Sequence, residues 1–428
     1  MRELQTEPLT HSLRSMPVAE RSGFLATSQG LAYEALESDL TFVQRLQPNL
    51  SLAEHLIENP IGYASIPLGV AEHFVIDGEP VWIPMAVEET SIVAAASATA
   101  KWIKKCGSIR TFLKGTSVIG QIQFPKVQNP EALSRVLYAR QAEILTLANT
   151  VVPGLVRRGG GFSDLKVREL VREDSASMVI LDLFCDPCDA MGANLLNQAC
   201  EFLKVPLQTW TNERIGMCIL SNLTDTKLAC AEIVVDGVSP EFGRNIEDAM
   251  QFARLDPYRA ATHNKGVMNG IDAVLIATGN DWRAVEAGAH AFAARSGKYQ
   301  PLTSWKFEDG RLHGSIEVPM SVGTVGGATR LMPAARFALA LLNTTSSARL
   351  ARICAAVGLV QNLGALRALC TEGIVKGHMQ LHAKNLALAA GAEPEESEAV
   401  VASLLQKLET CGFISEQDAH DLLLRRRD

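Results

Sequence analysis

The sequence has no long run of basic residues. Its 428 residues contain 40 Lys and Arg against 47 Asp and Glu, which leaves a formal charge of −7. A sequence-independent grip on nucleic acid or on anionic lipid needs clustered Lys and Arg. The composition therefore excludes both as partners, and we expect neither nucleic-acid nor membrane binding.

The sequence also lacks an uninterrupted apolar run long enough to cross a membrane, and we expect no secretory leader. Runs such as residues 91–100 stop after about ten residues, whereas a membrane helix needs about 20. The first residues have neither a positive start nor an apolar stretch. Nine cysteines, an odd number at irregular spacing, favour free thiols in a reducing compartment. We expect a cytoplasmic protein.

Internal repeats and the G-x-G-x-x-G fingerprint of the usual dinucleotide fold are both missing. Solenoids and propellers are thereby excluded. Two glycine clusters, at residues 159–161 and 322–327, provide flexible backbone. Such backbone can approach a ligand closely or merely turn the chain, and both interpretations stay open.

The pattern of apolar residues predicts an α+β fold. Residues 1–50 look helical, and residues 74–84 are typical of a hairpin that turns at Asp77-Gly78. Between about residues 116 and 222 the order is strand, helix, strand, strand, helix, strand, as in a ferredoxin-like unit. The expected strands are residues 117–124, 166–173, 177–184 and 215–220, and the expected helices are residues 130–150 and 191–202.

Two pairs of residues resemble metal or redox motifs. Cys185 and Cys188 have C-x-x-C spacing, but no second half of a zinc site is recognisable, so structural thiols are favoured. His378 and His382 would share one face of a helix. Met379 stands where a zinc hydrolase has its glutamate, and we expect no metal.

Residues 256–272 and 277–283 pack polar and charged groups among glycines, which favours a functional site. With other segments they resemble the 3-hydroxy-3-methylglutaryl-coenzyme A (HMG-CoA) reductase family, in its soluble class II bacterial and archaeal form. The resembling blocks occur in the family's order at residues 58–62, 87–97, 189–194, 256–283, 319–329, 361–365 and 377–379.

The resemblance implies a reaction in which two NAD(P)H reduce HMG-CoA through bound mevaldehyde to mevalonate and CoA, or the reverse. Lys265 matches the cation that stabilises the developing negative oxygen. Asp281 matches the carboxylate that keeps this lysine protonated, brought back beside it by the 16-residue excursion. Glu89 matches the catalytic acid, and a carboxyl acts near neutral pH only when burial raises its pKa. His378 matches the acid that protonates the departing thiolate.

From the residues alone Glu88 and Glu89 are not distinguished, and Asp281 reads equally as a helix N-cap. For the carboxylate and hydroxyl groups of the substrate, the family's contacts are matched by Arg259, Asn269, Ser91, Glu58, Asn59 and Gln361.

For the nucleotide, the resemblance points to the start of a helix, where N–H groups can receive a pyrophosphate. The matching residues are Asp189, Met191, Gly192, Ala193 and Asn194. Val152 stands where NADH-preferring relatives can carry an aspartate, and Arg157 or Arg158 could bind a 2′-phosphate. We therefore favour NADPH over NADH.

The resemblance further implies a large substrate-binding domain at residues 1–115 and 222–373, with a ferredoxin-like NAD(P)-binding domain inserted at residues 116–221. A small helical flap would occupy residues 374–428 and close over the substrates. Relatives self-associate as dimers or larger homo-oligomers with active sites at the subunit interface. Two alternatives stay open: a CoA-thioester binding or hydrolysing protein, and a thiol or metal protein built on Cys185 and Cys188.

Overall fold

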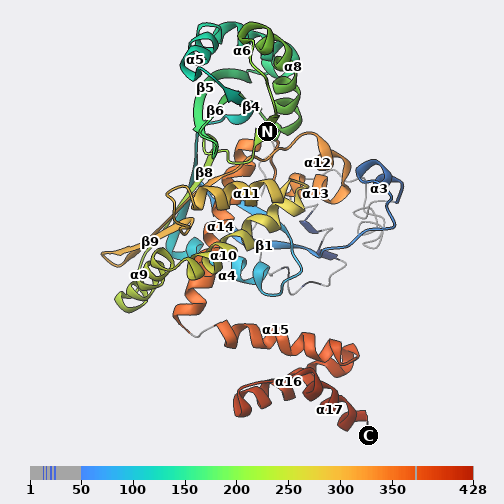
Figure 1. The fold of residues 1–428 in the computed structure, drawn as a ribbon. Coiled ribbons are helices and arrows are strands. Elements are labelled where there is room, and N and C mark those ends of the chain that lie inside the picture. Colours follow the sequence, from blue (N-terminus) through green and yellow to red (C-terminus); the bar gives the residue numbers. More distant parts are fainter. Residues whose placement is uncertain are drawn as a thin grey trace, which may run out of the picture.

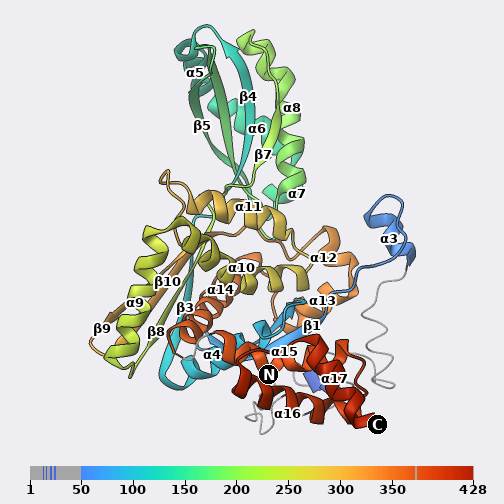
Figure 2. The same cartoon turned by 60° about the horizontal axis from the view of Figure 1, so that its bottom comes forward.

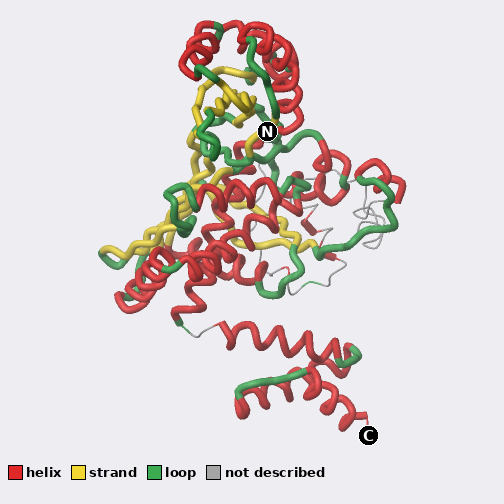
Figure 3. Tube along the Cα trace, in the orientation of Figure 1, coloured by secondary structure: helices red, strands yellow, loops and turns green. Residues whose placement is uncertain are grey.

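The computed structural model describes Leu13, Met16, Glu20, Arg21, Phe24, Leu25, residues 50–371 and residues 374–427, without the side chains of residues 374–381, 394 and 409. Most of the helical expectation for residues 1–50 therefore lies outside the described residues. The described chain builds three larger hydrophobic cores. Figure 1 places the corresponding units one above another, and Figure 3 shows helices and strands mixed in the upper two. The predicted α+β class is confirmed.

The upper unit is a four-stranded antiparallel sheet in the order β5-β6-β4-β7, with helices along one face (Figure 2). Its elements are β4 (Val118–Val127), α5 (Pro130–Ala139), α6 (Gln141–Val151), α7 (Pro153–Val156), β5 (Gly161–Val171), β6 (Ser177–Asp186), α8 (Ala193–Thr211) and β7 (Cys218–Ser221). The predicted alternation of strands and helices is present. The single helix expected at residues 130–150 is instead broken at Arg140, where the backbone leaves helical angles.

The middle unit combines a hairpin, a second antiparallel sheet in the order β3-β8-β10-β9, and long helices. Because β3 pairs with β8, chain segments before and after the upper unit share one sheet. Its elements are α3 (Leu50–Leu56), β1 (Leu68–Ile76), β2 (Glu79–Ala86), α4 (Ile92–Cys106), β3 (Gly107–Lys114), β8 (Leu228–Val235), α9 (Pro240–Leu255), α10 (Pro257–Ala277), α11 (Trp282–Ala293), β9 (Thr303–Glu308), β10 (Arg311–Pro319), α12 (Gly327–Leu331), α13 (Pro333–Leu341) and α14 (Ser347–Cys370).

The predicted turn at Asp77-Gly78 is confirmed. Asp77 (φ 53°) and Gly78 (φ 84°) both have positive φ, as a two-residue type I′ hairpin requires. The strands that flank it, β1 and β2, pair in antiparallel register.

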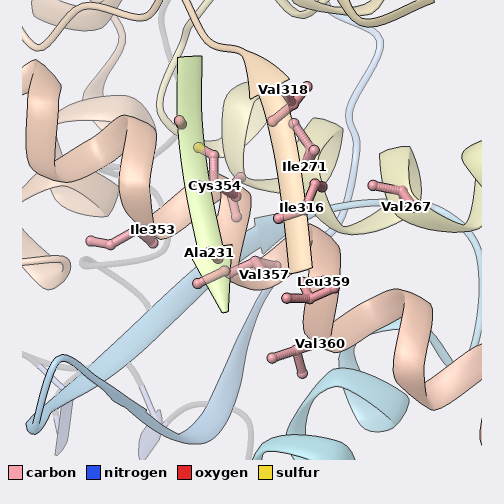
Figure 4. Close-up of a cluster of buried hydrophobic side chains, with 14 of the residues drawn as sticks. Ala231, Val267, Ile271, Ile316, Val318, Ile353, Cys354, Val357, Leu359 and Val360 are labelled. Carbon is pink, nitrogen blue, oxygen red and sulfur yellow. The ribbon is translucent and has the colours of Figure 1, made fainter. Parts of the chain in front are cut away.

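Helices α10 and α14 cross at close range inside the middle core. A Cβ atom on Gly270 would lie 2.9 Å from both the Cβ atom of Gln361 and the carbonyl oxygen of Val357. Figure 4 shows the apolar side chains of this region, including Ile271 of α10 and Cys354 of α14. The position of α10 is therefore set by backbone-level contact with α14.

Helix α14 corrects one expectation. Its 24 residues have a mean hydropathy of 1.6 over an 18-residue window, so by length and composition alone this helix could cross a membrane. This property was not predicted from the sequence, because Arg349, Arg352 and Arg367 interrupt the apolar run. However, 67% of that window is buried inside the protein, as is usual for a core helix.

The lowest unit in Figure 1 is a helical hairpin with one further helix, and it follows α14 directly. Its elements are α15 (Ile374–Ala389), α16 (Pro394–Cys411) and α17 (Glu416–Arg427). Ala383, Val400, Leu404 and Leu423 belong to its own small core.

Candidate active site

Lys265 and Glu89 form an ion pair on the surface of the middle unit. Lys265 projects from the middle of α10, and Glu89 lies between β2 and α4. The Nζ atom of Lys265 donates a hydrogen bond of 2.7 Å to Oε2 of Glu89. The structure thus selects Glu89 over Glu88 as the partner of the lysine. However, the two side chains are 60% and 42% exposed, so a single chain does not provide the burial that the sequence analysis expected for Glu89.

Asp281 does not lie beside Lys265 in the same chain. The segment that was expected to bend back is a continuous helix of 21 residues, and only three residues lie between its end at Ala277 and Asp281. Lys265 precedes Ala277 by 12 residues, which corresponds to about 18 Å along the helix axis at 1.5 Å per residue. A lysine and an aspartate side chain cannot span this distance.

Asp281 instead begins α11. Its Oδ1 atom accepts a hydrogen bond of 3.2 Å from the backbone N–H of Ala284, and Nη2 of Arg283 lies 3.2 Å from the same oxygen. The preceding turn is fixed because the N–H of Gly323 donates to Oδ1 of Asn280. Gly323 also lies against the backbone of Met191, where a Cβ atom would be 2.7 Å from the amide nitrogen. Close approach of backbone therefore explains at least this glycine of the 322–327 cluster.

Two expected substrate contacts lie near the ion pair in the chain. Asn269 is one helical turn after Lys265 on the same face of α10 and is half-buried. Ser91 follows Glu89 by two residues and begins α4 with φ 77°. A positive φ is strained for a residue other than glycine, and such strain concentrates at functional sites.

The other expected substrate contacts are more dispersed. Arg259 lies on α10 about 120° around the helix from Lys265, and burial lowers the pKa of its guanidinium. Gln361 of α14 is 5% exposed, and its Oε1 atom has no hydrogen-bond partner among the described residues. Glu58 and Asn59 lie in the exposed segment between α3 and β1. In Figure 1, α3 is far from the middle of α10.

His378 lies in α15, but its side chain is outside the described residues. Its position relative to Lys265 and Glu89 therefore stays a prediction. Its sequence neighbour at helical spacing, His382, is exposed.

The expected nucleotide segment connects the upper and middle units. The carboxylate of Asp189 accepts the N–H of Ser347 at 2.9 Å, and the hydroxyl of Ser321 donates to the carbonyl of Met191 at 3.0 Å. The side chain of Asp189 therefore anchors this segment to the start of α14.

The start of α8 has the geometry of an anion site. Gly192 begins the helix with φ 100° and has no side chain to cap the first N–H groups, which are available to a pyrophosphate together with Ala193 and Asn194. Arg157 and Arg158 are exposed, and the carbonyl of Arg158 lies 3.9 Å from the Sγ atom of Cys188. The charge of Arg158 also acts on that thiol, so positive charge lies beside this segment, and the start of α8 fits the pyrophosphate of a dinucleotide.

Val152 does not face this site. It is 3% exposed and belongs to the hydrophobic core of the upper unit. Val152 therefore has no direct contact with a cofactor at this site. It can influence cofactor choice only because an acidic side chain is absent at this position.

Two residues beside the nucleotide segment were not predicted from the sequence. Lys227 is 4% exposed; burial lowers the pKa of its ammonium group, while Asp186 and Asp189 oppose that shift. The hydroxyl of Thr224 is buried without a partner among the described residues. It lines a cavity of about 20 Å³ that Ala193 of α8 also lines. In the sequence both read as ordinary loop residues, because only the fold brings them to the start of α8.

The pair of Cys185 and Cys188 does not have the properties of a redox site. All nine cysteines are free, as predicted. Burial raises the pKa of Cys185 to about 12 and also raises that of Cys188. Because the thiolate is the reactive form, this pair is unsuited to redox catalysis. Among the described residues no group of three or more His, Cys, Asp or Glu could hold a metal ion.

Comparisons with known proteins agree with this geometry. Residues 17–383 match the family model of hydroxymethylglutaryl-coenzyme A reductase. The 3-hydroxy-3-methylglutaryl-coenzyme A reductase of Archaeoglobus fulgidus is 45% identical over 390 residues, which cover 90% of this chain and 88% of that protein. The probable enzyme of Borreliella burgdorferi is 35% identical and covers 78% and 77%.

Solved structures give the same result. The reductase of Streptococcus pneumoniae matches with a TM-score of 0.81 and 37% identity over 96% of this chain and 98% of that one. A class II structure of this enzyme bound to NADPH in open conformations matches with a TM-score of 0.80 and 38% identity, over 84% and 99%. The fold and site thus define an NAD(P)-dependent oxidoreductase. The chain belongs to the hydroxymethylglutaryl-coenzyme A reductase family, in its class II form, as the sequence predicts.

Proposed function

We propose that this protein reduces HMG-CoA to mevalonate and CoA with two NADPH, through mevaldehyde that remains bound. The observation that carries the proposal is the 2.7 Å pair of Lys265 and Glu89 in a member of this reductase family. When bound, the nicotinamide supplies hydride to the carbonyl carbon.

Lys265 binds the carbonyl oxygen and stabilises the negative charge that develops on it. One such preorganised donor is worth about 3 to 4 kcal/mol of barrier. Glu89 is hydrogen-bonded to the lysine and passes a proton to the same oxygen as the alcohol forms. His378 protonates the CoA thiolate, and Arg259, Asn269, Ser91, Gln361, Glu58 and Asn59 hold the substrate.

Asp281, which keeps Lys265 protonated, comes from a second copy of the chain. The length of α10 supports this arrangement, because it separates the two residues within one chain. The segment after α3 supports it too. Ile61 is 100% exposed, and Ile57 and Ile66 are also exposed, which is typical of a surface that a partner covers. The oligomer would bury the exposed ion pair of Lys265 and Glu89.

NADPH is the preferred cofactor. The first N–H groups of α8 receive its pyrophosphate, and Arg157 or Arg158 pairs with its 2′-phosphate. Both arginines are exposed, and the chain carries no acidic residue at Val152 to repel that phosphate.

The proposed domains follow the three cores: a large domain at residues 1–115 and 222–373, a nucleotide domain at residues 116–221 and a flap at residues 374–428. We place the protein in the cytoplasm, where a reducing environment keeps its free cysteines in the thiol form.

Co-expression of the variants Lys265→Ala and Asp281→Ala tests the reaction and the shared site together. Each variant alone should oxidise NADPH with HMG-CoA at no more than about a hundredth of the wild-type rate. Random pairing makes half of the dimers mixed, and each mixed dimer has one intact site of two, so about a quarter of wild-type activity should return. No return would refute the shared site. Absence of NADPH oxidation by the folded wild-type protein would refute the reaction itself.

A further inference from the structure

Two carboxyl groups meet where α10 and α11 pack together. Asp272 of α10 and Glu286 of α11 are in hydrogen-bonding contact through their side chains. The Oδ1 atom of Asp272 is buried and has no partner among the described residues. Two carboxylates have no hydrogen to share, so this contact requires that one of the two groups carries a proton.

The groups that shift the pKa of Asp272 include no cation. The groups that act on Asp272 are Glu286 from α11 and, on the side of α14, the thiol of Cys354. Cys354 is completely buried, and burial raises its pKa, so it stays neutral. Figure 4 shows Cys354 in a cluster of apolar side chains that also includes Ile271, which precedes Asp272 in the sequence. Burial and the charge of Glu286 raise the pKa of Asp272 to about 8.

The pair also closes the connection that carries Asp281. Asp272 lies five residues before the end of α10, and Glu286 is the fifth residue of α11. Between them the chain makes the short turn from Thr278 to Asp281. A side-chain contact between the two helices that flank this turn fixes the angle between them. It therefore also fixes the position of Asp281, which begins α11.

We infer that Asp272 and Glu286 are positioning residues, which share one proton across the junction of α10 and α11 and thereby hold Asp281 in place for the reaction. The inference rests on the proposed function for the role of Asp281. Neither residue touches the reacting atoms. Both act through the packing of the helix that Asp281 begins.

The dependence on pH follows from the proton. An aspartate in an unfolded chain loses its proton near pH 4, whereas Asp272 in the folded chain keeps it up to about pH 8. The stabilisation is complete at acid pH and is lost as the pH rises through this window. Above about pH 8 two adjacent negative charges repel each other, and α11 loses its alignment on α10.

The test compares wild type with Asp272→Asn and Glu286→Gln, which replace the shared proton by an amide that does not titrate. In wild type, kcat should fall at least about threefold between pH 7 and pH 9. In either variant that step should disappear while the KM for NADPH stays unchanged. Asp309→Asn, in the exposed turn between β9 and β10, is the matched control and should keep the wild-type profile.

Superimposable profiles of wild type and both variants would overturn the inference. So would a uniform loss of kcat at every pH, because a merely structural role has that result. If neither variant folds, infrared titration of the wild type decides, since absence of a protonated carboxyl group at about pH 7 overturns the shared proton. Failure of the wild type to oxidise NADPH at any pH, with this proton present, would refute the proposed function rather than the pair.

Discussion

Replacing Gly270 by alanine should separate α10 from α14. The added Cβ atom would lie 2.9 Å from the Cβ atom of Gln361 and 2.9 Å from the carbonyl oxygen of Val357. The carbonyl belongs to the backbone of α14 and cannot rotate away, so the helices must move apart by a few tenths of an ångström. At Gly266, one turn earlier on the same helix, an added Cβ atom would meet nothing within 4 Å, and Gly266→Ala is therefore the matched control.

The two substitutions change the free energy of unfolding through one effect that they share and a second effect that only one of them has. Alanine in place of glycine inside a helix stabilises by about 0.5 to 1 kcal/mol, and both variants gain this. Overpacking a tight interior contact costs about 1 to 3 kcal/mol, and only Gly270→Ala incurs it. The free energy of unfolding, measured by urea denaturation, should therefore be about 1 to 3 kcal/mol lower for Gly270→Ala than for Gly266→Ala. Equal stability of the two variants would refute the close contact between α10 and α14.

Three further outcomes are expected. Lys265→Ala should lower kcat for NADPH oxidation about 100- to 1,000-fold, whereas Lys306→Ala, which removes an exposed ion pair with Glu308, should leave kcat unchanged. Asp189→Ala should destabilise the protein by about 1 kcal/mol, because the N–H of Ser347 loses its acceptor, and should raise the KM for NADPH; Asp189→Asn, which keeps an acceptor oxygen, should behave like wild type in urea. Cys185→Ser should retain activity within about threefold, since a thiol with a pKa of about 12 is not a nucleophile at neutral pH. Complete loss of activity in a folded variant would instead support a protein whose chemistry depends on Cys185 and Cys188.

Local signals in the sequence predicted local structure well. The turn at Asp77-Gly78 could be predicted because both residues tolerate positive φ, and both adopt it. The strands of the upper unit were predicted from the pattern of apolar residues, and β6 begins at the expected residue, Ser177. The ion pair of Lys265 and Glu89 could be predicted only as two members of a family pattern, because 176 residues separate them.

The prediction that the segment after Lys265 bends back to Asp281 was wrong for a physical reason. Gly266, Gly270 and two asparagines lower its helix propensity, so it read as a site-forming excursion. Tertiary packing overrides this propensity, because Gly270 is needed for the close approach of α14. Once the segment is a rigid helix, its length alone overturns the predicted contact with Asp281. The pair of Asp272 and Glu286 was equally invisible, since no spacing rule links carboxylates on two different helices.

The same rigidity gives α10 its place in the proposed mechanism. Because Lys265 lies in the middle of α10 and Asp281 begins α11, the α10–α11 segment of one chain can present a cation to one site and a carboxylate to another. A dimer with twofold symmetry then builds two equivalent sites from two copies of this unit. A change in the alignment of α11 on α10 would alter the carboxylate of the site that the other chain's lysine occupies. The proton shared by Asp272 and Glu286 therefore links the two active sites of the proposed dimer, and its loss would displace Asp281 in the site that contains the other chain's lysine.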